Sequence, residues 1–138
     1  MITKDGKTTK KHFEVFEREV WKWVRRFGLL DWDVVVEHME LENENSSAEC
    51  AYNMEAKSAT IRLNTTFTVD DQPFRTRELK ESAFHEVCEL LLCPLGYLAE
   101  SRYTTYEQIQ TVRHGIVQRL LNGLFRETSK GARGERSK

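Results

Sequence analysis

Residues 83–92 read AFHEVCELLL, and this apolar stretch decides how the rest of the chain must fold around it. Three ionisable residues, His85, Glu86 and Glu89, interrupt it. On a helix with about 100° per residue, His85 and Glu89 lie one turn apart on one face, and Glu86 lies beside them. The surrounding apolar residues predict a helix that is buried on most sides. Burying an imidazole and two carboxylates there is costly unless a partner such as a metal ion compensates.

The spacing is close to the H-E-x-x-H motif, in which two histidines hold zinc and the glutamate acts as a base. Here the second histidine position is Glu89, and a carboxylate is also an acceptable zinc ligand. The residues therefore predict His85 and Glu89 as metal ligands and Glu86 as a base acting on water. A motif this short also occurs on helices whose carboxylates are simply solvated, so the five residues alone leave both interpretations open.

The length of 138 residues fits one domain, for which we predict the bounds 12–126. Residues 1–11 and 127–138 are basic and poor in apolar side chains, so we expect two disordered tails. The net charge of the whole chain is only −1, which leaves the body between these tails acidic. An acidic body argues against a nucleic-acid-binding face on the folded domain.

The expected location is the cytoplasm. No apolar run approaches the roughly 20 residues that span a bilayer, and the first residues, MITKDGKTTKKH, contain no signal-peptide core. The three cysteines are odd in number and match no zinc-ribbon spacing, which is typical of a reduced compartment. We therefore expect no membrane partner.

The hydrophobic periods predict an α+β fold with three main helices and a small, three-stranded, mostly antiparallel sheet. Pro94 and Gly96 are expected to end the central helix. Along the second strand, one face is expected to point inward. The predicted helices are 12–27, 76–93 and 104–125, the predicted strands are 32–41, 48–54 and 59–64, and the inward residues of the second strand are Ala48, Cys50, Tyr52 and Met54.

This order of elements resembles the minimal zincin-like metallopeptidases, including SprT-like domains and the small metallopeptidases of phages and prophages. The matching residues are the strand ATIRLN at 59–64, the helix AFHEVCELLL about twenty residues later, and a last helix that carries His114 and Arg119. The resemblance spans roughly residues 10–125. It implies a zincin-like fold in which a sheet packs on the motif helix, with residues 59–64 as an edge strand along the cleft.

The resemblance also implies a cofactor, Zn²⁺, and assigns roles residue by residue. His85 matches the first zinc ligand, Glu86 the general base and Glu89 the second ligand position. The third ligand of the family comes from downstream. His114 is the first choice, Glu107 or Glu100 are alternatives, and a site without a third protein ligand stays open.

Two functions follow from these residues. The first is zinc-dependent hydrolysis of peptide bonds, with a peptide or protein as substrate, in the host cytoplasm if a phage encodes the chain. The alternative is a catalytically inactive zincin-like scaffold that binds a partner protein, such as a phage or prophage accessory protein. A third interpretation, nucleic-acid binding through the basic tails, predicts steeply salt-dependent binding.

Overall fold

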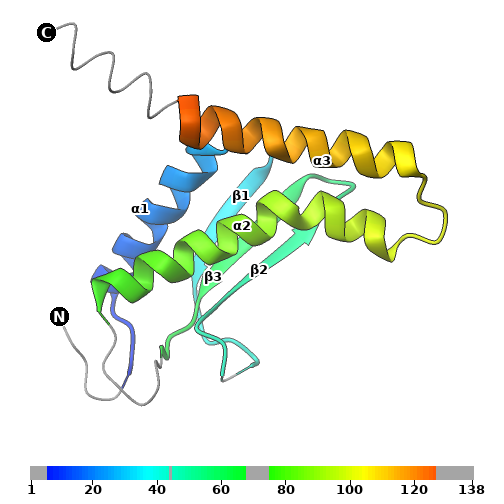
Figure 1. Ribbon diagram of the computed structural model, residues 1–138. Helices are drawn as coiled ribbons and strands as arrows, with labels where there is room; N and C mark the ends of the chain where they lie inside the picture. Colours follow the sequence, from blue (N-terminus) through cyan, green and yellow to red (C-terminus); the bar gives the residue numbers. More distant parts are fainter. Residues whose placement is uncertain (1–5, 44, 68–74, 127–138) are drawn as a thin grey trace, which may run out of the picture.

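The computed structural model describes residues 6–43, 45–67 and 75–126, and within these ranges it confirms the α+β class with three helices and three strands. The elements run from one end of the chain to the other as shown in Figure 1. They are α1 (Lys10–Arg26), β1 (Asp33–His38), β2 (Ala48–Asn53), β3 (Ser58–Leu63), α2 (Thr76–Glu100), α3 (Tyr106–Leu120) and the π-helix η1 (Leu121–Arg126).

The sheet has the strand order β1-β3-β2, so β3 is the central strand. β3 pairs with β2 in antiparallel and with β1 in parallel orientation. The sheet is therefore mixed rather than mostly antiparallel, and residues 59–64 do not form the edge strand that the resemblance implied. The hydrophobic alternation of a strand is the same in either orientation, so the sequence pattern could not give the strand direction.

A ladder of charged side chains crosses all three strands on the face away from the helices. Arg62 of β3 contacts Glu37 of β1 through Nε at 3.0 Å and Glu49 of β2 through an η nitrogen at 2.9 Å. Both glutamates are direct register partners of Arg62. The opposite face of β3 carries Ala59, Ile61 and Leu63, which are buried.

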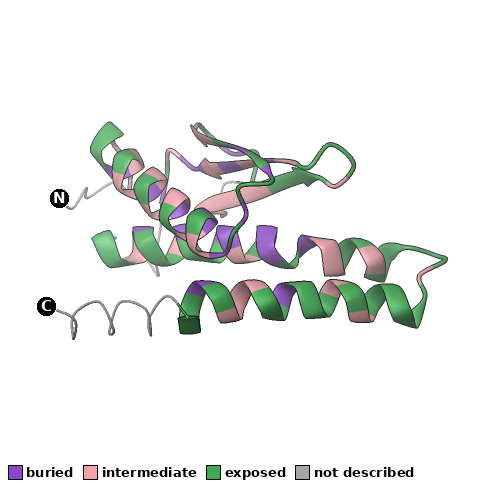
Figure 2. Ribbon diagram, turned by 90° about the horizontal axis from the view of Figure 1, so that it is seen from above, coloured by how far each residue is buried: buried purple, intermediate pink, exposed green. Residues whose placement is uncertain are grey.

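The core lies between this apolar face of the sheet and the helices. α2 packs against α1, β2 and α3, and seen from above it is the middle layer between the sheet and α3 (Figure 2). The 3.6-residue period of α1 and α2 supplies half of the buried hydrophobic side chains of the core, and the rest come from the strands, the connecting segments and α3. These include Phe16, Val20 and Val24 of α1, Leu79, Ala83, Val87 and Leu90 of α2, and Ile116 of α3.

The expected disorder of residues 1–11 is wrong for residues 6–11. Lys7 forms a bridge with Thr66, and Thr8 is buried and donates its amide to Thr65 O at 2.8 Å. Thr9 then caps α1 by accepting a hydrogen bond from the amide of His12. Amino-acid composition does not predict the order of this segment, because backbone hydrogen bonds and the helix cap hold it in place and few apolar side chains contribute. Residues 1–5 and the predicted tail at 127–138 lie outside the described residues.

The helix that carries the motif is longer than predicted, because it continues through Pro94 to Glu100. Pro94 has no N–H, so it cannot form the helical hydrogen bond to the carbonyl of Leu90, and this normally ends or bends a helix. Here Cys93 is buried and Leu95 packs against the core, which favours continuing the helix past the proline. Within the described residues no helix is long and apolar enough to cross a membrane.

Candidate metal centre

The motif residues sit near the middle of α2, where the helix has one buried and one exposed side. Val87, Leu90 and Leu91 fix the buried side by packing into the core. The side chains of His85 and Glu89 are therefore on the outer side, with exposed fractions of 68% and 61%. Glu86 is different, because only 9% of its side chain is exposed.

The three side chains contact one another in the way that the spacing predicts. His85 Nδ1 lies 3.0 Å from Glu86 Oε1, within hydrogen-bonding distance. His85 Nε2 lies 3.9 Å from Glu89 Oε1, which is close but beyond a hydrogen bond. One ring nitrogen thus faces a buried carboxyl group and the other faces an exposed one.

Glu86 is a mostly buried carboxyl group of α2, and its charge acts on Cys50 of the neighbouring strand β2. Burial raises the pKa of Glu86, and the negative charges of Glu89 and Glu49 act in the same direction. The hydrogen bond from His85 acts against them and favours the ionised form. A carboxyl group with a raised pKa and a histidine partner is the type of group that enzymes use to accept and return protons.

The raised pKa of Glu86 predicts how stability changes with pH. The folded carboxyl group keeps its proton at pH values where the unfolded chain releases it, so the folded state loses stability as the pH rises through the raised pKa. Glutamine does not titrate. We expect the melting temperature of metal-free Glu86→Gln, relative to that of the wild type, to increase as the pH rises from about 4.5 through the raised pKa of Glu86, measured by thermal melts. Glu81→Gln, at an exposed position of α2, is the control and should show no such gain.

Two residues of β2 border this site. The sequence predicts both as inward-facing residues of a strand and gives no sign that they lie near the motif. Cys50 is half-buried, and burial together with the negative charge of Glu86 raises the pKa of its thiol to about 12. Tyr52 follows on the same face, and burial raises the pKa of its hydroxyl, with further contributions from Cys93, Glu100 and Glu89. Tyr52 is 42% exposed, so its ring borders the solvent at the sheet edge instead of filling the core.

The third predicted ligand, His114, does not join this group. It is exposed on α3, and it lies two residues, or about 200° of helical turn, from the buried Ile116. His114 therefore points away from the side on which α3 packs. Glu100 is on α2 itself, but eleven residues beyond Glu89, which is about 16 Å along the axis. Glu107 is also exposed on α3.

The described residues contain no group of three or more His, Cys, Asp and Glu side chains that could hold a metal ion. The pair His85 and Glu89 nevertheless fits a shared ion. Two ligand atoms about 2.1 Å from one zinc at a tetrahedral angle are roughly 3.4 Å apart, and the observed separation of 3.9 Å closes with a small side-chain rotation. The structure thus brings two of the side chains predicted as ligands close together, and it places the third elsewhere.

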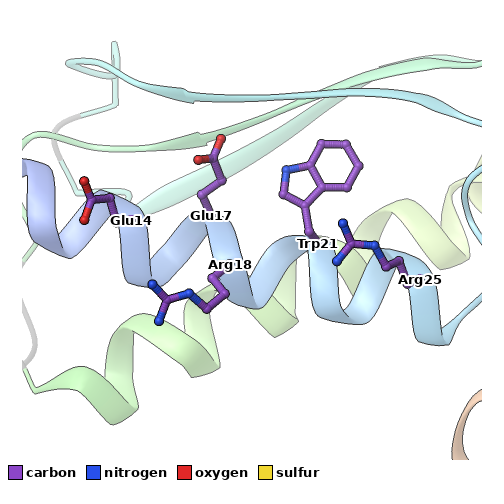
Figure 3. Close-up of a pocket in the computed structure, with 5 residues that line it drawn as sticks. All are labelled: Glu14, Glu17, Arg18, Trp21 and Arg25. Carbon is purple, nitrogen blue, oxygen red and sulfur yellow. The ribbon is translucent and has the colours of Figure 1, made fainter.

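Two hollows in the described surface border α1, and neither is lined by His85, Glu86 or Glu89. One, of about 330 Å³, is lined by α1 residues, of which Glu17 and Trp21 point toward the sheet (Figure 3). The other, of about 410 Å³, lies between α1 and the start of α2, where the rings of Trp23 and Phe84 are 4.7 Å apart. Neither contains a histidine, and the acidic and basic side chains that line them are typical of a solvated surface.

Comparison with known proteins gives no family for this chain: no family model matches it, and no curated protein and no solved structure matches it. The chemistry of the motif and its geometry on α2 therefore carry the functional argument.

Proposed function

We propose that the protein binds Zn²⁺ through His85 and Glu89 and hydrolyses peptide bonds with Glu86 as the general base. One observation carries this proposal. A buried carboxyl group with a raised pKa lies 3.0 Å from an imidazole whose other nitrogen faces a second carboxylate at 3.9 Å. The choice of a peptide as substrate rests on the resemblance of residues 59–64 and 83–92 to zincin-like peptidases.

Each residue of the chain has a separate role in this proposal. His85 Nε2 and Glu89 hold the ion on the exposed side of α2. Bound zinc supplies a Lewis acid, which makes a water molecule more acidic and a carbonyl group more reactive. Glu86 accepts the proton of the attacking water and returns it to the leaving amine. The edge strand beside α2 is β2, so an extended peptide would lie along β2 and pair with its backbone.

The proposed setting is the cytoplasm, and the proposed partners are peptides or proteins. All three cysteines, Cys50, Cys88 and Cys93, are free, as expected of a chain in a reducing compartment. Burial raises the pKa of each thiol, which makes a reactive thiolate unfavourable. The cysteines are therefore assigned to packing and not to catalysis.

The position of His114 favours a second candidate function. A catalytic zinc site normally has three protein ligands, and α3 turns its histidine away from the pair on α2. In this alternative the motif helix is kept as part of a scaffold that binds a partner protein without hydrolysis. The metallopeptidase requires zinc binding and the general base Glu86 for its function, and the scaffold requires neither.

Zinc content of two variants tests the proposal. Glu89→Ala removes a ligand, so we expect it to lose zinc and the thermal stability that zinc binding adds. Glu86→Gln keeps both ligands, so we expect it to retain zinc and to lose hydrolysis of a peptide substrate. Glu81→Ala removes an exposed carboxylate from the same helix and is the matched control, which should retain both.

The measurement is elemental analysis of protein purified without chelators or affinity nickel, followed by melts with and without added zinc. Full zinc in Glu89→Ala contradicts the ligand assignment. A wild-type chain that binds no zinc contradicts the metallopeptidase and favours the scaffold.

A further inference from the structure

The backbone of β2 forms one edge of the described sheet (Figure 1). The amide of Asn64 donates to Ser47 O at 2.8 Å, which fixes the alternation of the antiparallel ladder between β2 and β3. Residues 49, 51 and 53 therefore direct their N–H and C=O groups toward β3. The N–H and C=O groups of Ala48, Cys50 and Tyr52 point the other way, toward the edge.

This edge lacks the features that usually prevent a strand from pairing with another chain. Proteins protect edge strands with lysine, with proline or with a bulge. β2 reads AECAYN, so it contains neither residue, and it pairs with β3 from Ala48 to Asn53 without a bulge. An extended segment can therefore add to β2 as a further strand.

The helix beside this edge is α2, and its side chains here are acidic. α2 packs against β2, and residues 82–100 include Glu86, Glu89 and Glu100 but no lysine or arginine. The last turn of α2 also has no basic residue, although such residues normally offset the partial negative charge of a helix C-terminus. Because β2 brings no basic residue either, the edge has negative charge beside it and no lysine or arginine from α2 or β2.

Glu89, Gly96 and Glu100 share the side of α2 that borders the edge. At about 100° per residue, these three positions fall within about 40° of one another. Burial raises the pKa of the Tyr52 hydroxyl, and the charges of Glu100 and Glu89 act in the same direction, as expected of carboxylates near β2. A Cβ added at Gly96 would meet no atom within 4 Å, so the space between the two carboxylates is open to another side chain.

We propose that the edge of β2 binds an extended basic peptide, which pairs antiparallel to β2 and directs lysine or arginine side chains toward the carboxylates of α2. Glu100 is the contact outside the pair assigned to zinc. Alternate residues of an extended chain face the same side, so we expect a basic residue at every second position. This inference deepens the proposed function and takes from it the peptide along β2. It names the chemistry of that peptide, whether the peptide is a substrate or a bound partner.

Binding is tested without zinc. The probe is a short labelled peptide of alternating lysine and threonine, and its fluorescence anisotropy is measured with the full chain in the presence of a chelator. We expect binding that weakens as salt is added, and binding at least about tenfold weaker when glutamine replaces each lysine. Equal binding of the two peptides overturns the proposal.

This design separates the inference from the proposed function. A chain that binds no zinc but binds the lysine peptide contradicts the metallopeptidase and supports the basic-peptide edge. Zinc-dependent hydrolysis that is equally fast for the lysine and glutamine peptides supports the metallopeptidase and contradicts the basic-peptide edge.

A substitution at Glu100 tests the acidic contact. Glu100→Gln removes one carboxylate and leaves His85 and Glu89 in place, so we expect the lysine peptide to bind about 2–5-fold more weakly. Binding of the glutamine peptide should not change. Glu81→Gln removes an exposed carboxylate near the start of α2 and is the matched control, which should bind as the wild type does. An unchanged affinity in Glu100→Gln contradicts the assigned contact.

Methyl groups on the peptide backbone test the strand pairing. Lysines that lie opposite Ala48, Cys50 and Tyr52 in an antiparallel pair direct their N–H groups toward β2, whereas the threonines between them direct theirs away. N-methylation of the lysines is therefore expected to abolish binding, and N-methylation of the threonines to leave it close to that of the unmodified peptide. A lysine-methylated peptide that binds at least as tightly as the threonine-methylated one overturns the proposal.

Discussion

Replacing Gly123 with alanine is expected to lower the melting temperature by roughly 10 °C, the result of about 3 kcal/mol of overpacking. Gly123 is a buried residue of η1 and lies against the backbone of Arg26 at the end of α1. An added Cβ would lie 2.0 Å from the carbonyl oxygen of Arg26 and 2.7 Å from its carbonyl carbon. These are backbone atoms, so relief requires one helix to move relative to the other.

Gly115→Ala is the matched control for this substitution. Gly115 is also a helical glycine near the end of the chain, but a Cβ there meets no atom within 4 Å. We expect this variant to be stabilised by about 0.5–1 kcal/mol, because alanine favours the helix. Both variants are measured by thermal unfolding. Equal melting temperatures for the two would show that α1 and η1 do not pack as closely as described.

The second large effect is expected at Asn64, where leucine should destabilise the fold by roughly 2–4 kcal/mol. Asn64 follows β3, has only 2% of its surface exposed and is a hydrogen-bonding centre for two loops. Its Oδ1 accepts from the amide of Leu41 at 3.2 Å and from that of Thr66 at 3.4 Å, and its Nδ2 donates to Ser46 O at 2.8 Å. Leucine fills the space but leaves these backbone groups unpaired.

The control is Asn53→Ala, which removes an asparagine whose hydrogen bond to the amide of Ala56 is exposed. Water replaces an exposed hydrogen bond, so the expected loss is about 0.5 kcal/mol. Urea unfolding of both variants gives the comparison. A loss at Asn64 no larger than that at Asn53 would show that the loop amides find other partners.

Sequence reasoning predicted the helices and strands because each has a clear hydrophobic period. Phe13, Phe16 and Val20, for example, are three and then four residues apart, which places them on one face of a helix but on both faces of a strand. The hydrophobic period does not show whether two strands pair in parallel or antiparallel orientation. It also does not show whether a proline ends a helix. The parallel pairing of β1 with β3 and the passage of α2 through Pro94 were therefore not predictable from the pattern.

The same limit applies to the candidate site. His85, Glu86 and Glu89 were predictable as neighbours because their geometry is local to one helix. His114 comes from another helix, and its orientation depends on which side of α3 packs on α2. The apolar residues of α3 and η1 extend around much of the helix, and Val117 of α3 and Leu124 and Phe125 of η1 remain exposed. The sequence therefore defined a wide apolar arc, and His114 at its margin could not be assigned to either side.

The Arg62 ladder gives the sheet a way to reject wrong strand pairings during folding. Exposed ion pairs of this kind add little stability, so the value of the contact lies in selectivity. A slip of β3 by one residue would turn Arg62 toward the helices, bring Ile61 into water and break both carboxylate contacts at once. Parallel neighbours far apart in sequence, such as β1 and β3, meet late and search among several registers. Arg62 meets a carboxylate on both flanking strands only in the observed register. These two contacts therefore favour the observed register over the alternatives.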